Sequence, residues 1–451
     1  MDDACASNEV METLAARAEE AERLGVAPGE GQSPTRPRRL LICLDGVPFE
    51  VIRALKSRGM FDNFREPARL LSPFPTLTNV ALAQMLGATP PQGYESLYFD
   101  RDSRELRGGV SKYIGRRTPD KAPSSYMEEL DYQEPLPFEF LIYVATDAVW
   151  QADMRRFRER FLSAPPTRDF FGFLKATDGL LHIAGPERLS VAMRSLDRIL
   201  RRLQGECGSE TEIVVFSDHG MNLVENRRVH LQSHLRSAGY DVLGSMRARM
   251  RGSRQVAAPA FGLCGYVALY CGEEVDRARL ARDLTGLEGV DFSVHRDDDG
   301  ETVVVTGVRG RALVAREQRG ASAAYRYEQV DGDPLGLAAV SQDLREEGVM
   351  DGRGFAPDEA WLSRTWDAER PDALANVFES VTSPRVRHTA DVLVSLQDGY
   401  YYGAPAFSRM VRLLATHGNA LRPSSQAFLM STHRSFPDYT RACEARPLLR
   451  D

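Results

Sequence analysis

The sequence predicts an α/β protein with a doubly wound, mostly parallel sheet, helices on both faces and a small α+β insertion. Two observations lead to this fold class. Several apolar runs are continuous rather than alternating, which is typical of strands covered on both faces. Segments with helical periodicity lie between these runs, and alternating strands and helices form parallel sheets. The 451 residues are 43% apolar and 27% charged, an ordinary globular composition.

The first part of the chain divides into a tail and a core. Residues 1–37 are expected to be a disordered tail, because Pro, Gly and Ser dominate "VAPGEGQSPTRPRR". Residues 38–245 are expected to form the first part of a catalytic core. Its strands are predicted at "LLICL", "FEFLIYVAT" (138–146), "DFFGFLKAT" (169–177) and "EIVVFS". A helix is predicted after Pro186, where apolar residues recur every three or four positions: Leu189, Met193, Leu196, Leu200 and Leu203.

The pattern changes at about residue 246. Short strands are predicted at "GYVALYC", "DFSVHRD" and "ETVVVTGV", with a helix at "EVDRARLARDLTGL" and a hairpin turn at "RDDDGET". We therefore expect residues 246–345 to be an α+β insertion that caps the active-site edge. Residues 346–451 are expected to complete the core, with late strands at "ADVLVSL" (390–396) and "AFLMST" (427–432).

The charge and the cysteine content limit the binding partners, the cellular location and the disulfides that the sequence allows. The net charge of −7 gives no polybasic signature, so stable nucleic-acid binding is not expected. No apolar run reaches 18 residues, and the acidic N-terminus lacks the apolar segment of a signal peptide. The prediction is a cytoplasmic protein without membrane attachment, whose oligomeric state the sequence leaves open. The six cysteines form no CxxC pair, and a disulfide between Cys264 and Cys271 stays open.

Three of the predicted core strands end in an aspartate: Asp45, Asp178 or Asp218. The carboxyl ends of parallel strands lie along one edge of a sheet, where ligands bind. The three carboxylates can therefore converge, and they repel one another unless cations lie between them. This arrangement predicts a metal site.

Three histidines accompany these aspartates. His182 follows Asp178 by four residues, a spacing that puts both on one side of a helical turn. His219 is adjacent to Asp218, and His417 lies in "LLATHGNA", where Gly418 permits a tight turn.

Taken together, these segments resemble the alkaline phosphatase superfamily, and within it the type I phosphodiesterase and nucleotide pyrophosphatase branch. "LICLDGV" resembles the first metal-binding strand of that family, and "SPFPTLTNVALAQMLGATPPQGYE" resembles its nucleophile segment. "DGLLHIAGP", "VVFSDHGM" and "THGNALRPSSQAFLM" resemble its three later metal-binding motifs. The likeness covers about residues 39–235 and 385–432.

The resemblance implies two divalent ions, one bound by Asp178, His182 and His417, and the other by Asp45, Asp218 and His219. Thr78 is implied as the nucleophile that contacts the second ion. Zinc is favoured by the mixed imidazole and carboxylate ligands, with manganese as the alternative. Two such ions and three aspartates leave a charge of +1, which suits an anionic ester.

The implied function is hydrolysis of a small phosphate ester, of phosphodiester or nucleotide pyrophosphate type, through a phosphothreonine intermediate. The alternatives on the same scaffold are a phosphomonoesterase, a phosphonate hydrolase, a phosphomutase, or a metal-binding protein without activity. Residues between threonine and asparagine are usual in the family, but here Asn79 follows Thr78 directly, and Thr76 is a competing nucleophile. No arginine matches the phosphate-binding arginine of monoesterases, which favours diesters.

Some of these residues also have structural explanations. Thr78 could act as a helix N-cap, and Asp178 and His182 could be an ordinary helical pair. His230 and His234 share the four-residue spacing but fit an amphipathic helix. Tyr94 and Tyr98 could line a substrate pocket or pack.

Overall fold

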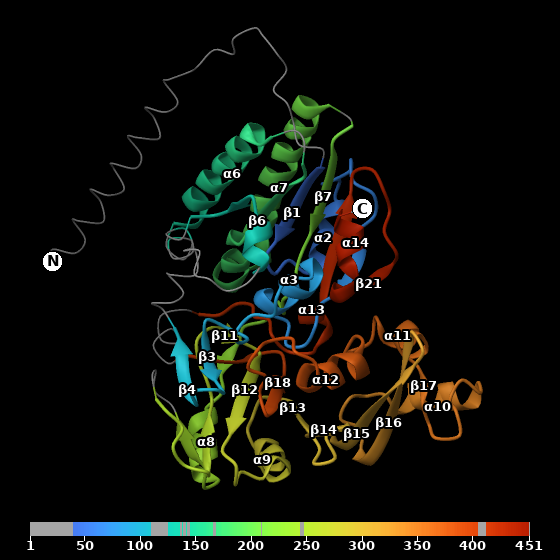
Figure 1. Ribbon diagram of the computed structural model, residues 1–451. Helices are drawn as coiled ribbons and strands as arrows, with labels where there is room; N and C mark the ends of the chain where they lie inside the picture. The colour runs from blue at the N-terminus through green and yellow to red at the C-terminus, as the bar shows by residue number, and fades with distance from the viewer. Residues whose placement is uncertain are drawn as a thin grey trace, which may run out of the picture. The chain divides into compact units, whose positions relative to one another are not determined.

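The computed structural model describes residues 39–109, 125–135, 138, 141, 145–165, 168–208, 210–243, 248–404 and 412–450 (Figure 1). The tail predicted over residues 1–37 lies outside them. The core is a seven-stranded sheet in the order β21-β2-β20-β7-β1-β6-β5. Its strands, in chain order, are β1 (Arg39–Leu44), β2 (Ala68–Leu71), β5 (Tyr132–Gln133), β6 (Phe170–Leu174), β7 (Glu212–Phe216), β20 (Gln426–Ser431) and β21 (Tyr439–Arg441).

Most strand pairs of this sheet are parallel, as the sequence predicts. Strand β1 lies parallel to β6 and β7, β5 is parallel to β6, and β2 is parallel to β21. Strand β20 is antiparallel to both of its neighbours, β2 and β7. The central strands β1, β6 and β7 therefore end at the same edge.

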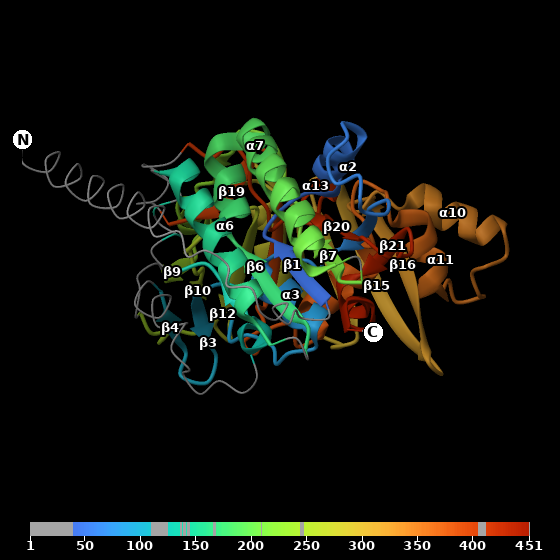
Figure 2. The same ribbon diagram turned by 90° about the horizontal axis from the view of Figure 1, so that it is seen from above.

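Helices cover both faces of the sheet (Figures 1 and 2). Leu40, Ile42 and Leu44 of β1 pack with α2 (Phe49–Ser57), α6 (Thr146–Ser163) and α7 (Ala176–Cys207). The alternate residues Leu41 and Cys43 pack with α3 (Thr78–Leu86), the 3₁₀ helix η1 (Tyr126–Glu129) and α14 (Ala445–Arg450). Because successive strand residues point to opposite faces, a continuous apolar run is what a doubly covered strand requires. The predicted α/β fold class is confirmed.

Helix α7 contains the helix predicted after Pro186. It is kinked at Gly185, whose backbone φ is 73°, directly before the proline. The five apolar residues predicted to form its stripe, Leu189 to Leu203, are buried. The kink separates a short N-terminal part, which carries Asp178 and His182, from the long part that covers the sheet.

A second sheet has nine strands in the order β17-β16-β15-β14-β13-β18-β12-β10-β9. In chain order they are β9 (Asp241–Leu243), β10 (Gln255–Ala257), β12 (Tyr266–Cys271), β13 (Val290–Arg296), β14 (Thr302–Gly307), β15 (Gly310–Arg319), β16 (Ser322–Gly332), β17 (Ala356–Pro357) and β18 (Val392–Leu396). One face packs against α8 (Leu231–Ser237) and α9 (Arg277–Leu284). The other packs against residues of α10 (Ala338–Glu346), α11 (Asp358–Thr365) and α12 (Ala373–Thr382).

This second sheet extends beyond the predicted insertion. The strands and the helix predicted between residues 265 and 308 are present as β12, α9, β13 and β14. The predicted strand 390–396 is also present, but it pairs with β12 and β13 in the second sheet rather than joining the core. The predicted strand over 138–146 lies mostly outside the described residues. Phe138 and Leu141 are helical, Thr146 begins α6, and β5 instead is the neighbour of β6.

The remaining elements are small. Strands β3 (Leu97–Asp100) and β4 (Glu105–Gly108) form a hairpin, and β8 (Arg227–Arg228), β11 (Leu263–Cys264) and β19 (Tyr400–Gly403) form a three-stranded sheet. A short helix, α13 (Arg422–Ser425), precedes β20, and the 3₁₀ helix η3 (Ala442–Glu444) precedes α14. Cys264 and Cys271 are both free thiols, so the disulfide left open by the sequence is not formed.

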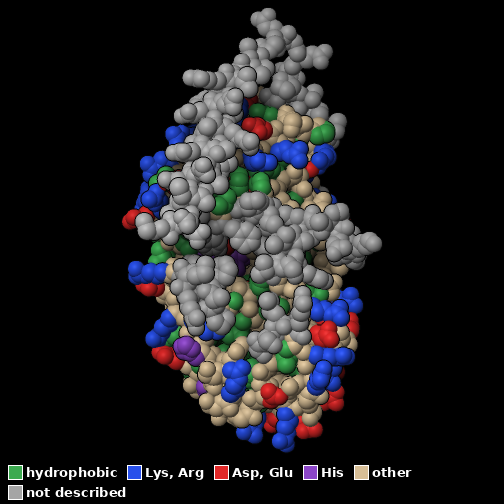
Figure 3. Space-filling model, turned by 90° about the vertical axis from the view of Figure 1, so that its left-hand side faces the viewer, with side chains coloured by type: hydrophobic (Ala, Val, Ile, Leu, Met, Phe, Trp, Pro, Cys, Tyr) green, Lys and Arg blue, Asp and Glu red, His purple; other side chains and the backbone are tan. Residues whose placement is uncertain are grey.

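Within the described part of the chain, every helix is too short or too polar to cross a bilayer. On the face drawn in Figure 3, basic and acidic side chains are interspersed rather than gathered by sign.

Candidate active site

Two neighbouring strands bring Asp45 and Asp218 together. In the parallel pair β1 and β7, Cys43 lies opposite Phe216, so the residues after both strands emerge side by side. Asp45 and Asp218 are almost completely buried, as is His219. The backbone N–H of Gly46 donates to Oδ1 of Asp218 at 3.2 Å. The register of these two parallel strands thus places the two carboxylates close together.

Gly46 makes the turn after β1 possible. Its φ of +72° is a left-handed conformation that glycine adopts without strain. A Cβ atom there would lie 3.0 Å from Cε of Met221 and 3.2 Å from Oδ1 of Asp178. The glycine therefore keeps the space between the carboxylates open.

Asp178 reaches the same edge from a helix rather than a strand end. Strand β6 ends at Leu174 and α7 begins at Ala176, so the prediction that Asp178 ends a strand is wrong. Asp178 instead lies in the first turn of α7, one turn before His182. Nε2 of His182 is 3.1 Å from Oδ1 of Asp178. The sequence spacing was informative because both residues share one side of this turn.

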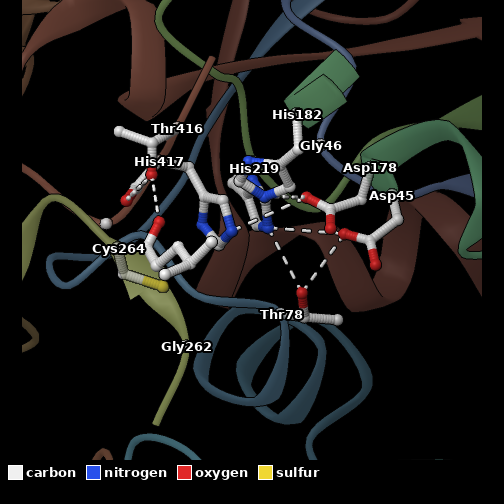
Figure 4. A network of polar contacts seen from close by, with 12 residues as sticks. Asp45, Gly46, Thr78, Asp178, His182, His219, Gly262, Cys264, Thr416 and His417 are labelled. Carbon is white, nitrogen blue, oxygen red and sulfur yellow. Dashed lines mark hydrogen bonds and ion pairs between the residues drawn. The ribbon is translucent and has the colours of Figure 1, made fainter. Parts of the chain in front are cut away.

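His417 joins these residues from the loop before α13. Its ring stacks on that of His219, with centroids 4.0 Å apart, and its Nε2 lies 3.6 Å from Oδ1 of Asp178. Gly418 follows with a φ of +112°, the tight turn that the sequence predicts. The structure thus brings six of the seven predicted side chains into two adjoining groups. We call them the Asp178 cluster (Asp178, His182 and His417) and the Asp218 cluster (Asp45, Asp218 and His219). Figure 4 shows Asp45, Asp178, His182, His219 and His417.

Thr78 is the first residue of α3, and Leu77 is the N-cap, so Thr78 does not serve as the N-cap. Its hydroxyl lies 3.2 Å from Oδ1 of Asp45 and 3.2 Å from Nε2 of His219 (Figure 4). Thr76 is placed differently. Its buried hydroxyl donates to the carbonyl of Asn419 and accepts from the N–H of Gly418. Of these two threonines, Thr78 is therefore the one whose hydroxyl contacts the Asp218 cluster.

The tautomers of the three histidines are fixed by backbone carbonyls. Nδ1 of His182 lies 2.7 Å from the carbonyl of Ala415, Nδ1 of His219 lies 2.9 Å from that of Gly220, and Nδ1 of His417 lies 2.8 Å from that of Thr76. A carbonyl can only accept, so each Nδ1 carries the proton. In the neutral rings, each Nε2 then presents a lone pair, which is how metal-binding histidines are oriented in proteins.

These lone pairs face carboxylate oxygens. Nε2 of His219 is 3.4 Å from Oδ1 of Asp45 and 3.4 Å from Oδ2 of Asp218. One oxygen of each aspartate, namely Asp45 Oδ2, Asp178 Oδ1 and Asp218 Oδ2, is buried without a hydrogen-bond donor among the described residues. Acceptors that face acceptors repel unless a proton or a cation lies between them. The donor set and its orphaned oxygens fit divalent cations.

The pKa values of these residues bear on whether a proton or a cation lies between the facing acceptors. Burial lowers the pKa of His219 to about 4 and that of His417 to about 3, so both rings are neutral near pH 7. Burial also raises the pKa of Asp218 to about 6 and that of Asp45 well above its usual range. Burial opposes ionisation of Asp178 too, but His182 and His417 outweigh it and its pKa is lowered. Burial also lowers the pKa of His182, but Asp178 outweighs it and raises that pKa, so without a cation a proton lies between these two side chains. Burial thus disfavours the negative charges of Asp45 and Asp218, which repel each other, and added positive charge would stabilise both ionised carboxylates.

A third group of potential ligands, Asp100, Asp102 and His388, differs in chemistry. Asp100 accepts from two backbone N–H groups and pairs with Arg107, and Asp102 pairs with Arg387. Nδ1 of His388 accepts from the N–H of Arg101, so in the neutral ring Nε2 carries the proton. The lone pairs of this group are already occupied, which makes it a polar packing cluster.

Other candidate residues from the sequence have structural roles. Nε2 of His234 lies 2.7 Å from the carbonyl of Asp283, and His230 precedes α8 as its N-cap. Tyr94 is buried and accepts from the N–H of Ala390. Tyr98 stacks on His388, with ring centroids 5.7 Å apart.

A network missed by the sequence holds the two histidine loops. Oδ1 of Asp398 accepts from the side-chain amides of Asn222 and Asn419, at 3.1 and 3.0 Å. Oδ1 of Asn222 accepts from the N–H of Thr416, beside His417. Asp398 follows β18, so the second sheet anchors both loops. No periodicity or spacing connects these residues, although Asn222 directly follows the "DHGM" motif.

A doubly covered α/β sheet that gathers carboxylates, imidazoles and a hydroxyl at one edge defines a class, the alkaline phosphatase superfamily of metal-dependent hydrolases. A model of the type I phosphodiesterase / nucleotide pyrophosphatase family matches residues 97–330, slightly more than half of the chain. The chain belongs to this family and is a hydrolase that acts on phosphate esters. The match includes Asp178, His182, Asp218 and His219, whereas Asp45, Thr78 and His417 lie outside it.

Among solved structures, phosphonoacetate hydrolase from Sinorhizobium meliloti 1021 in complex with phosphonoformate is similar, with 13% identity, a TM-score of 0.47, and coverage of 92% of this chain and 95% of that chain. Murine ectonucleotide pyrophosphatase / phosphodiesterase 5 has 12% identity, a TM-score of 0.46, and coverage of 91% and 94%. An inactive variant of the murine protein in complex with AMP has the same identity and TM-score. A search of curated proteins gave no match.

Proposed function

We propose that the chain hydrolyses phosphate esters of the phosphodiester or nucleotide pyrophosphate type, with Thr78 as the nucleophile and two divalent ions as cofactors. The observation that carries the proposal is the orientation of the three histidines, whose Nε2 lone pairs face carboxylate oxygens without donors. The Asp178 cluster and the Asp218 cluster would each hold one ion. Zinc suits three carboxylate and three imidazole ligands, and manganese is the alternative.

The residues divide the chemistry between them. When bound, the ions would lower the pKa of a coordinated hydroxyl and offset negative charge on the phosphoryl group. Thr78 presents its hydroxyl 3.2 Å from Oδ1 of Asp45 and 3.2 Å from Nε2 of His219, so it would contact the ion held by these residues, and its proton would pass to solvent water. The threonine oxygen forms a bond to phosphorus while the bond to the leaving oxygen breaks. Water then hydrolyses the phosphothreonine and restores the hydroxyl.

The start of α3 supports this role for Thr78. The first N–H groups of a helix have no partner within it and favour anions. A phosphoryl group bound to Thr78 would lie at this helix end. Thr76 instead stabilises the loop that carries His417, because its hydroxyl hydrogen-bonds to the backbone of Gly418 and Asn419.

The predicted insertion, residues 246–345, is proposed to border the site and to shape substrate choice. The N–H of Gly265 donates to the carbonyl of His417 at 2.6 Å, and the hydroxyl of Thr416 donates to the carbonyl of Leu263. The segment around β11 thus contacts the histidine loop directly. The domain boundaries, the small-molecule substrate without nucleic-acid or membrane partners, and the cytoplasmic location stay predictions.

The test compares wild type, Thr78→Ala and Thr76→Ala for metal content and for hydrolysis of bis-p-nitrophenyl phosphate and p-nitrophenyl phosphate. Thr78→Ala should lose nearly all turnover and retain its metal, whereas Thr76→Ala should retain turnover. The diester should be the better substrate. Full activity in Thr78→Ala would remove the nucleophile, and absence of metal after reconstitution with zinc or manganese would remove the cofactors. Faster cleavage of the monoester would support the phosphomonoesterase alternative.

A further inference from the structure

A hollow lined by arginines lies in the second sheet, away from the two clusters. Strand β12 connects the two places. At its start, the N–H of Gly265 contacts the histidine loop, and at its end, the N–H of Cys271 donates to Oδ2 of Asp391 at 2.8 Å. A strand rises about 3.3 Å per residue, so the six residues of β12 separate these ends by about 20 Å. Asp391 lines the hollow, which therefore lies far from Thr78.

The hollow has a volume of about 410 Å³, which is within the range of small-molecule sites of roughly 300–1,000 Å³. Four arginines from four separate segments line it: Arg101, Arg277, Arg296 and Arg387. We call it the arginine pocket. Arg101 follows β3, Arg277 begins α9, Arg296 ends β13, and Arg387 lies in the loop before β18. No single helix or charged stretch of sequence accounts for this gathering.

The charges in the pocket do not balance. Asp391 is the one carboxylate in its lining, and Asp102 pairs with Arg387 from outside it at 3.2 Å. Four guanidinium groups against two carboxylates leave +2, in a chain whose net charge is −7. The last turn of α12 also lines the pocket, but a helix C-terminus supplies only about half a negative charge. The pocket therefore remains positive.

Part of the pocket is held in place. Arg101 pairs with Oδ1 of Asp391 at 2.8 Å, donates to the carbonyl of Thr389 at 2.7 Å, and lies over the ring of Tyr270. Arg296 donates to the carbonyl of Gly300 at 2.8 Å. Arg277 has no carboxylate within 4.0 Å among the residues that the structure describes, which leaves its donors for a ligand. Fixed and unpaired guanidinium groups together form a recognition site for an anion.

We propose that the arginine pocket binds a small phosphate-bearing anion, as a site separate from the catalytic one. Guanidinium groups match phosphate oxygens with paired N–H donors, and several of them around one hollow favour more than one phosphate group. The ligand is either a free diphosphate-type molecule or the phosphate headgroup of a lipid, which share this chemistry. The proposal does not depend on the role of Thr78.

The test is a calorimetric titration of the metal-loaded full chain with methylenediphosphonate, whose P–C–P bridge resists hydrolysis. Wild type is compared with Arg277→Ala/Arg296→Ala and with the control Arg254→Ala/Arg279→Ala. The control removes the same charge from exposed arginines that pair with Glu274 and Asp283 outside the pocket. Sedimentation with phosphatidylcholine vesicles, with and without phosphatidate, distinguishes the lipid source.

Wild type and the control should show two binding events, one at the catalytic site and one at the pocket. The pocket variant should lose the second or weaken it at least tenfold, with an unchanged rate of ester hydrolysis. Sedimentation that requires phosphatidate, Arg277 and Arg296 would assign the ligand to a lipid headgroup. Since both substitutions in the pocket variant are at exposed side chains, a single Arg277→Ala variant gives the same comparison if the double variant is unstable. A single event in wild type, or a second event of wild-type affinity in the pocket variant, without such sedimentation would overturn the proposal.

Discussion

Removal of metal should destabilise the protein by an amount that the orphaned carboxylate oxygens determine. Three of these oxygens, one each on Asp45, Asp178 and Asp218, are buried without donors among the described residues. A buried polar atom without a partner costs about 1–3 kcal/mol, and more if it is charged. The three together correspond to about 3–9 kcal/mol. Two ions present at about a thousand times their Kd would contribute about 8 kcal/mol, which agrees with this range.

The size of the protein converts this free energy into a temperature. The unfolding entropy is about 2.1 cal/mol/K per residue, which gives roughly 0.9 kcal/mol/K for residues 36–451. Each kcal/mol therefore moves Tm by about 1 °C. Chelation of the metal-loaded protein should lower Tm by about 3–10 °C in differential scanning fluorimetry. Re-addition of zinc or manganese should restore it.

A matched control comes from the third group of ligand-type residues. Asp100→Asn/Asp102→Asn should keep the full response to chelation, because the carboxylates of that group are already paired. Asp178→Asn should lose much of the response. An unchanged Tm after chelation of protein shown to contain two ions would refute the reasoning, and so would loss of the response in the Asp100→Asn/Asp102→Asn variant.

Three further predictions follow from the same contacts. In metal-free protein the raised pKa of Asp218, about 6, means that protons compete with the ion below that pH. Affinity at the Asp218 cluster should fall about tenfold per pH unit there. In the Asp178 cluster burial lowers the pKa of His182, but Asp178 outweighs burial and raises it, so a proton on this ring competes with the ion already above the pH range in which Asp218 titrates. The ion of the Asp178 cluster should therefore begin to weaken first, and earlier weakening at the Asp218 cluster in an acid titration with metal analysis would contradict this. Asp398→Ala leaves two amide donors unpaired and should cost about 2–6 kcal/mol in a urea titration and lower metal affinity, whereas a stable variant with normal metal content would show that the anchor is dispensable. Gly220→Ala should yield little folded protein, because its Cβ would lie 2.1 Å from the carbonyl of Pro423, whereas Gly205→Ala, with open space on α7, should be neutral or stabilising in soluble yield and Tm.

The core sheet could be predicted from sequence because its strands are covered on both faces. Leu40 to Leu44 must be apolar at every position, since alternate residues pack against helices on opposite sides. The edge strands carry no such signal. Strand β5 has two residues, and a two-residue strand has no periodicity to detect. The sequence instead predicts a strand at the longer apolar run 138–146.

The second sheet shows another limit. Its strand β18 was predicted from its apolar residues, but its place between β12 and β13 was not. A buried strand is equally apolar in either sheet, so composition cannot decide which sheet it joins. Only the pairing of residues far apart in the chain assigns it, and a single sequence does not contain that information.

The candidate site could be predicted to the extent that its residues share local motifs. Asp178 and His182 are one helical turn apart, and Asp218 and His219 are adjacent. The four-residue spacing of Asp178 and His182 correctly predicted that they lie together, even though Asp178 was expected at the end of a strand. Asp398, by contrast, acts on loops that are separated from it by 21 and 176 residues. Contacts of that kind leave no local pattern.

The three imidazoles of the site are oriented by main-chain oxygens, which belong to Ala415, Gly220 and Thr76. A side-chain acceptor disappears with one codon change, but a main-chain oxygen is present whatever residue occupies the position. The orientation of the imidazoles therefore follows from the path of the chain, and substitution at Ala415 or Thr76 removes neither of the carbonyls that accept from their Nδ1 atoms. Such a centre tolerates sequence drift around it and is lost through insertions, deletions or glycine replacements that displace its loops. Mutational scans of this protein should show that asymmetry.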